Sequence, residues 1–238
     1  ARFSVSLRNI SDGDLLGPGA FVVYAGEEHP LLVAEQPGLA SLQDEADVTD
    51  LAADLASRTG LTAVFGPGVW AVHTERWLLF QEGASASSGL EVLAEDGDPL
   101  PLAQSLANEG ERVGVYGPGD GTSYSPQFPG QTSSFTVEAA PGELLSMAFM
   151  FSQSNDLFLS PEGGGLTLEE GDLTHAFVLW DAGTEANQEP GFGDDQGPRQ
   201  EGPNSGQDDP VDEVSPVDDG FDYPEVSSFL QVTVRRGP

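Results

Sequence analysis

The sequence predicts an all-β protein, an antiparallel β-sandwich with short helical excursions and long acidic loops. Brief segments that alternate apolar and polar residues recur along the chain, and turns rich in its 30 Gly and 18 Pro residues separate them. Regular alternation of strands with long helices, the sign of a parallel α/β sheet, is missing from the pattern. At 238 residues and 38% hydrophobic composition the chain can bury a core, and we expect one domain over residues 1–238.

Individual strands are predicted where this alternation is clearest. The segment 144–152 is apolar on both faces, so we expect it in the middle of the core. The segment 229–235 alternates, which is typical of a half-exposed strand. The predicted strands are 3–7, 20–24, 69–73, 133–139, 144–152, 174–180 and 229–235.

Helical spacing appears in two short segments, 47–56 and 101–107, where apolar residues recur every three or four positions. From residue 185 to 225 the chain is rich in Gly, Pro, Asp and Gln and poor in aliphatic residues, which predicts a long irregular loop. Residues 17–61 and 66–110 share short matching motifs. We interpret them as a duplicated strand–loop–helix segment.

The charge of the chain excludes several classes of partner. Forty acidic residues stand against eight basic ones, all of them arginine, and the formal net charge is −32. Nucleic acid is excluded because its phosphates are bound by Lys and Arg, and an anionic membrane is disfavoured for the same reason. Since no apolar run reaches about 18 residues, membrane insertion is not expected. Such self-repulsion predicts a saline habitat that screens it.

Groups for catalysis are scarce in the sequence. The chain has no Cys and no Lys, which excludes disulfides, thiol nucleophiles, Cys-based zinc sites and Schiff-base chemistry. His29, His73 and His175 lie far apart and not at metal-binding spacing. A carbohydrate-active enzyme is a disfavoured alternative, because among 40 acids a pair of carboxylates is not informative. We therefore expect no enzymatic activity.

Acids and amides follow two strongly apolar predicted strands, where solubility does not require them. Asn155 and Asp156 come after the segment 144–152, and Asp181 comes after the segment 174–180. Calcium takes about six to eight oxygen ligands from carboxylates, carbonyls and water in loops of this kind. Ca²⁺ is therefore the predicted ligand. The predicted metal-binding residues are Asp156, Asp181, Glu185, Asn155, Asp96 and Asp98.

The same stretches resemble a known family. They are LLSMAFMFSQSND at 144–156, LWDAGTEAN at 179–187 and GLEVLAEDGD at 89–98, and they are similar to the spondin N-terminal domain, the domain of F-spondin and mindin, in a microbial and halophilic form. The W-D-A-G-T element is the most specific. The resemblance implies a sandwich akin to a C2 domain, calcium held by acidic loops at Asp156, Asp181 and Glu185, and no catalysis.

The sequence thus favours a secreted calcium-binding protein with a binding or structural role at the cell surface or in the extracellular matrix. Secretion is expected because the chain begins at Ala1, as it would after removal of a signal peptide. An alternative is a self-assembling subunit of an extracellular filament or sheath, in which the terminal segments 3–7 and 230–234 pair with neighbouring copies. The expected partners are calcium and either further copies of the chain or a surface or matrix ligand.

Overall fold

A computed structural model describes residues 51, 64–74, 78–118, 125–127, 130–197 and 199–236. The chain divides into two compact units, Ala1–Gly60 and Leu61–Pro238, and every described residue except Leu51 belongs to the second. The predicted segments 3–7, 20–24 and 47–56 and the first repeat copy lie outside the described residues, apart from Leu51.

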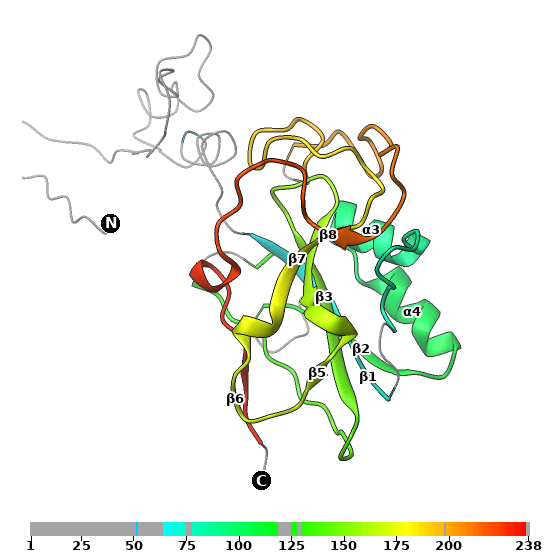
Figure 1. Ribbon diagram of the computed structural model, residues 1–238, viewed down its shortest axis with the longest axis vertical. Coiled ribbons are helices and arrows are strands. Elements are labelled where there is room, and N and C mark those ends of the chain that lie inside the picture. The colour runs from blue at the N-terminus through cyan, green and yellow to red at the C-terminus, as the bar shows by residue number, and fades with distance from the viewer. Residues whose placement is uncertain are drawn as a thin grey trace, which may run out of the picture. The chain divides into compact units, whose positions relative to one another are not determined.

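An antiparallel sheet forms the centre of the second unit (Figure 1). Its strands are β1 (Phe65–His73), β2 (Arg112–Tyr116), β3 (Leu144–Phe151), β4 (Leu157–Pro161), β5 (Leu166–Thr167), β7 (Phe177–Asp181) and β8 (Ser215–Pro216). The order across the sheet is β2-β1-β3-β4-β7-β8, and β5 also pairs with β3. Two further strands, β6 (Gly171–Asp172) and β9 (Thr233–Val234), pair only with each other. The prediction of an all-β, antiparallel, sandwich-like fold is confirmed.

Two α-helices, α3 (Ser88–Asp96) and α4 (Leu100–Asn108), lie on one side of the sheet (Figure 1). The second confirms the helix expected at 101–107, whereas α3 occupies a stretch that was expected to be a loop. It forms because the Ser87 hydroxyl accepts a hydrogen bond from the Leu90 N–H, 3.2 Å away, and Gly97 ends it in the left-handed region at φ 67°. No helix among the described residues is long and apolar enough to cross a membrane.

The helices pack on the sheet through small and branched side chains. Leu90 and Leu93 of α3 are fully buried, in one cluster with Val69 and Ala71 of β1. The two helices approach closely because residue 89 is glycine: a Cβ atom there would lie 2.7 Å from the Leu102 Cα atom. The close packing of the helices on this side of the sheet therefore depends on the volume of each side chain at the contact.

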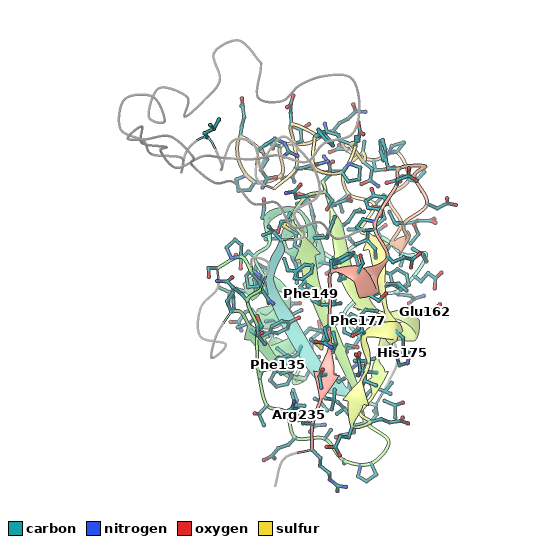
Figure 2. All side chains as sticks on the ribbon, turned by 90° about the vertical axis from the view of Figure 1, so that its left-hand side faces the viewer. Phe135, Phe149, Glu162, His175, Phe177 and Arg235 are labelled. Atoms are coloured by element: carbon teal, nitrogen blue, oxygen red, sulfur yellow. The ribbon has the colours of Figure 1, made fainter. Side chains whose placement is uncertain are left out.

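The opposite side of the sheet is covered by the C-terminal segment. Phe149 and Phe177 meet there with ring centroids 6.2 Å apart (Figure 2). Phe229 packs against Phe151, and Leu230 packs on the same cluster. Both faces of β3 are thus buried, as the apolar pattern of segment 144–152 predicted.

Several predicted strands are shorter in the structure. The segment 174–180 begins as a 3₁₀ turn, η2 (Thr174–Ala176), because the Asp172 carboxylate accepts from the Thr174 N–H at 3.0 Å, and β7 starts only at Phe177. The segment 133–139 forms no strand and makes one bridge, from Ser133 to Pro118. At the C-terminus, regular pairing is limited to β9, whose partner β6 belongs to the same chain. Contact between copies through the segments 3–7 and 230–234 stays a prediction.

Candidate functional site

The strand register places two acidic turns side by side at one end of the sheet. The turn 152–156 joins β3 to β4, and the segment 182–188 follows β7. Because Leu157 of β4 pairs with Asp181 of β7, the residue before β4 lies beside the residues after β7. The Ala182 N–H accordingly donates to the Asp156 carbonyl oxygen at 3.2 Å.

Asp156 organises the segment that follows β7. Its side chain is fully buried, and its Oδ2 accepts hydrogen bonds from Thr184 N at 2.7 Å, Thr184 Oγ1 at 3.2 Å and Glu185 N at 3.0 Å. Its Oδ1 is also buried but has no hydrogen-bond partner among the described residues. One half of this carboxylate therefore holds the backbone, and the other half is free to bind a ligand.

Asp181 lies close enough to Asp156 to affect its ionisation. Burial, reinforced by the charge of Asp181, raises the pKa of Asp156 to about 7, and burial also raises the pKa of Asp181. Asp181 Oδ1 accepts from Gly183 N at 2.7 Å, and its Oδ2 accepts from Asn187 Nδ2 at 2.5 Å. The Oδ1 atom of Asn187 is buried without a partner in the described part of the chain. Two unpartnered oxygens, one on Asp156 and one on Asn187, thus accompany this pair of aspartates.

Glu185 turns its carboxylate to other partners, although its N–H binds Asp156. Its side chain is 1% exposed, Oε1 accepts from Gly206 N at 2.7 Å, and Oε2 accepts from Asn155 Nδ2 at 3.3 Å. The Asn155 side-chain oxygen in turn accepts from Gln188 N at 3.1 Å. Asn155 and Glu185 therefore fasten the neighbouring loops to one another, and burial raises the pKa of Glu185.

The acids at the end of α3 have unequal surroundings. Asp98 is exposed, and its Oδ1 accepts from Leu100 N at 3.0 Å, where it stabilises the start of α4. Asp96 is half-buried and accepts from Gln200 Nε2 at 3.0 Å. Glu95, which was not among the predicted ligands, is the most buried of the three at 1% exposed. The helical spacing of Leu90, Leu93 and Ala94 was the signal that would have placed Glu95 next to the buried side of α3.

The irregular loop that follows is held by neutral amides. Gln196 is fully buried, and its Nε2 donates to the carbonyl oxygens of Gln188 and Glu189 at 3.2 and 2.8 Å. Its Oε1 accepts from Gly191 N at 2.9 Å and from the Arg199 guanidinium at 2.6 Å. One amide group therefore makes four hydrogen bonds and fixes the conformation of the loop over the acidic turns.

The donor set at Asp156 and Asp181 suits a hard cation only if neutral oxygens complete it. Within the described ranges, no three His, Cys, Asp or Glu side chains are placed to hold one metal ion together. Calcium, however, accepts amide, carbonyl and water oxygens beside carboxylates. The unpartnered oxygens of Asp156 and Asn187 are donors of this type. The residues present therefore fit calcium better than a metal that needs nitrogen or sulfur ligands.

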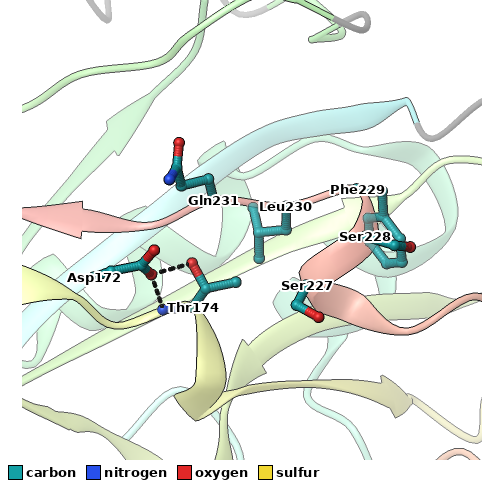
Figure 3. A pocket seen from close by; sticks show the side chains of 7 residues that line it. All are labelled: Asp172, Thr174, Ser227, Ser228, Phe229, Leu230 and Gln231. Carbon is teal, nitrogen blue, oxygen red and sulfur yellow. Dashed lines mark hydrogen bonds between the residues drawn. The ribbon is translucent and has the colours of Figure 1, made fainter.

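A separate pocket of about 390 Å³ lies between the start of η2 and the C-terminal segment (Figure 3). Asp172, Thr174 and residues 227–231 line it. The Asp172 carboxylate is already bound by Thr174, at 3.0 Å to N and 2.6 Å to Oγ1. The pocket shares no residue with the acidic turns, so we assign no ligand to it.

The fold and the acidic turns define the class of this protein: an antiparallel β-domain with acidic side chains on the loops at one end of the sheet. Residues 58–205 match the family model Spondin_N, and because the match spans more than half of the chain, the chain belongs to this family. The resemblance seen in the sequence is confirmed. The family consists of extracellular, non-catalytic binding domains. No curated protein matches the chain significantly.

Proposed function

We propose that this protein is a secreted, calcium-dependent binding domain that acts at the cell surface or in the extracellular matrix, in an adhesive or structural role. The observation that supports calcium most directly is the buried Asp156 beside the half-buried Asp181, with an oxygen of Asp156 that has no partner among the described residues. A buried carboxylate without compensation destabilises a fold by several kcal/mol, so such a pair needs protons or a cation. In the extracellular space near neutral pH, calcium is the abundant hard cation.

In this proposal Asp156 Oδ1, Asp181 and Asn187 Oδ1 hold the ion. Calcium, when bound, supplies positive charge that offsets the repulsion between the two aspartates. Asp156 Oδ2 already holds the backbone of Thr184 and Glu185, so the same residue joins the ion to the segment that follows β7. This loop end is therefore the surface on which we expect a partner to bind.

The net charge of −32 supports a saline environment. At low ionic strength the acidic surface repels itself, whereas concentrated salt screens it. The membership of an extracellular family supports secretion, and adhesion is proposed by analogy with that family.

Thermal unfolding in about 1 M NaCl, first with EDTA and then with excess calcium, tests the metal. A ligand that binds only the folded state adds about 2.7 kcal/mol at a hundredfold excess over its Kd. For a protein of this size the midpoint should therefore rise by about 5–10 °C. Asp181→Asn should strongly reduce the rise, whereas Glu162→Gln, which removes one exposed charge, should preserve it. An unchanged midpoint in the wild type would contradict the proposal.

A further inference from the structure

Glu95 is a buried carboxylate that the proposed calcium site does not use. Its side chain is 1% exposed and its Oε2 has no hydrogen-bond partner in the described part of the chain. The Thr184 hydroxyl hydrogen-bonds to this carboxylate. Burial raises the pKa of Glu95 to about 7, and the negative charges of Glu185, Glu91 and Asp96 add to the effect. The neighbouring charges with the largest effect on Glu95 are thus all of its own sign.

The position of Glu95 at the C-terminal end of α3 destabilises its negative charge further. Glu95 and Asp96 end the helix, at the negative pole of its dipole, and the last turn has no basic residue. Acids at that pole destabilise a helix, whereas cations stabilise it. The end of α3 therefore favours a positive charge that none of its own side chains provides.

A neutral amide side chain lies at the same helix end. Gln200 Nε2 donates to Asp96 Oδ1 at 3.0 Å and reaches the Glu95 carbonyl oxygen at 3.5 Å. This leaves the Gln200 Oε1 atom buried and without a partner among the residues that the structure describes. The negative charge of Glu185 acts on Glu95, and the Glu185 carboxylate accepts one hydrogen bond at each oxygen, from Gly206 N and from Asn155 Nδ2. Each carboxylate oxygen of Glu185 therefore keeps a lone pair for a further ligand.

From this geometry we propose a second cation-binding position, at the C-terminal end of α3, where Glu95 and Glu185 bind a divalent cation and Gln200 Oε1 completes the protein donors. The donors are all oxygens, which selects a hard ion such as calcium. The position is distinct from the Asp156 and Asp181 pair and does not depend on it for its donors.

The two positions are nevertheless adjacent through two residues. The Thr184 hydroxyl donates to Asp156 and is also a side-chain neighbour of Glu95, and Glu185 donates its N–H to Asp156 while the charge of its carboxylate acts on Glu95. Filling one position removes negative charge and orders the segment that the other also uses. We therefore expect calcium to bind the two positions with positive cooperativity.

Counting bound ions tests the inference. The whole protein, stripped with EDTA and then titrated with calcium, is examined by native mass spectrometry and calorimetry. The wild type should take up two ions, and Glu95→Gln, which keeps size and removes charge, should take up one. Glu109→Gln is the matched control: it removes one negative charge at an exposed position after the other helix, α4, and should still give two ions. If Glu95→Gln binds as many ions as the wild type, Glu95 is neutralised by a proton instead, and the inference is wrong.

The test separates this inference from the proposed function. Asp181→Asn should also leave one ion, the one at Glu95. If Asp181→Asn loses an ion and Glu95→Gln does not, only the second position is overturned. If Glu95→Gln loses an ion and Asp181→Asn does not, only the proposed site at Asp156 and Asp181 is overturned. A second variant, Gln200→Leu, keeps the inference testable if Glu95→Gln does not fold. It removes only the neutral oxygen donor and should weaken the binding of one calcium ion about tenfold. Unchanged affinity in Gln200→Leu would remove that residue from the site and overturn the inference as stated.

Discussion

Replacing Asp156 with Asn should stabilise the calcium-free protein at pH 8 and strongly reduce its response to calcium. The side chain is fully buried, and its pKa is raised from 3.8 to about 7, mainly by burial. When folding raises the pKa of a carboxyl group, the protein has its full stability at pH values below the pKa of that group in the unfolded state. It loses stability as the pH rises through the pKa of the group in the folded state. Wild-type stability without calcium should therefore fall between about pH 4 and pH 7.

The magnitude follows from the shift and the hydrogen bonds. A shift from 3.8 to about 7 corresponds to a destabilisation on the order of 4 kcal/mol at pH 8. Asn retains one oxygen for the Thr184 and Glu185 donors, but these bonds lose their charge assistance, which costs about 2 kcal/mol in total. The net gain is about 2 kcal/mol, or a midpoint about 4–8 °C higher for a protein of this size.

Melting followed by circular dichroism at pH 4, 6 and 8 in about 1 M NaCl measures this effect. With EDTA, the advantage of Asp156→Asn should grow with pH, and with calcium at pH 8 the wild type should become the more stable protein. Asp222→Asn, at an exposed position, is the matched control and should match the wild type throughout. If Asp156→Asn is less stable than the wild type at pH 8 in EDTA, the charged hydrogen bonds to Thr184 and Glu185 outweigh desolvation, and the reasoning is refuted.

Three further predictions concern packing and salt. Gly89→Ala should lower the midpoint by several degrees, because its Cβ would lie 2.7 Å from the Leu102 backbone, whereas Gly202→Ala meets nothing within 4 Å and should be tolerated; equal effects in calorimetry would contradict this. Leu93→Ala, at a fully buried position, should lose about 2–5 kcal/mol in denaturant unfolding, and Leu100→Ala, 47% exposed, well under 1. Lowering NaCl from about 1 M to 0.1 M lengthens the Debye length from about 3 to 10 Å and should destabilise the calcium-saturated protein; equal midpoints at both concentrations would exclude a saline adaptation.

The sequence allowed the centre of the fold to be predicted but not its helical side. The apolar segments 144–152 and 69–73 became β3 and β1 because nearly continuous apolar runs match burial on two faces. The helix α3 was missed because its nine residues include four acids or polar groups, and its signal lies in the Ser87 cap and in the buried apolar side chains of Leu90, Leu93 and Ala94. The pairing of β2 with β1 was also missed, since strand pairing depends on contacts between distant residues.

Part of the candidate site was also predictable from the positions of acids after apolar strands. Asp156 and Asp181 each follow an apolar strand, and neighbouring antiparallel strands bring those positions together. Side-chain direction was not predictable: the Glu185 carboxylate binds Gly206 and Asn155, and Asp98 stabilises a helix start. Among 40 acids, burial rather than residue type distinguishes a binding group from a solvated surface, and burial is a property of the folded chain.

The amide of Gln196 has a consequence for chemical ageing. Because its oxygen accepts two hydrogen bonds and its nitrogen donates two, replacement of the nitrogen by oxygen would leave the carbonyl groups of Gln188 and Glu189 facing an acceptor. Hydrolysis of this amide to Glu would also place a new negative charge in a fully buried position, in a loop next to carboxylates that already repel one another. Complete burial keeps solvent water from the amide. The same burial that lets one glutamine hold the loop thus also preserves it from the reaction that would release the loop.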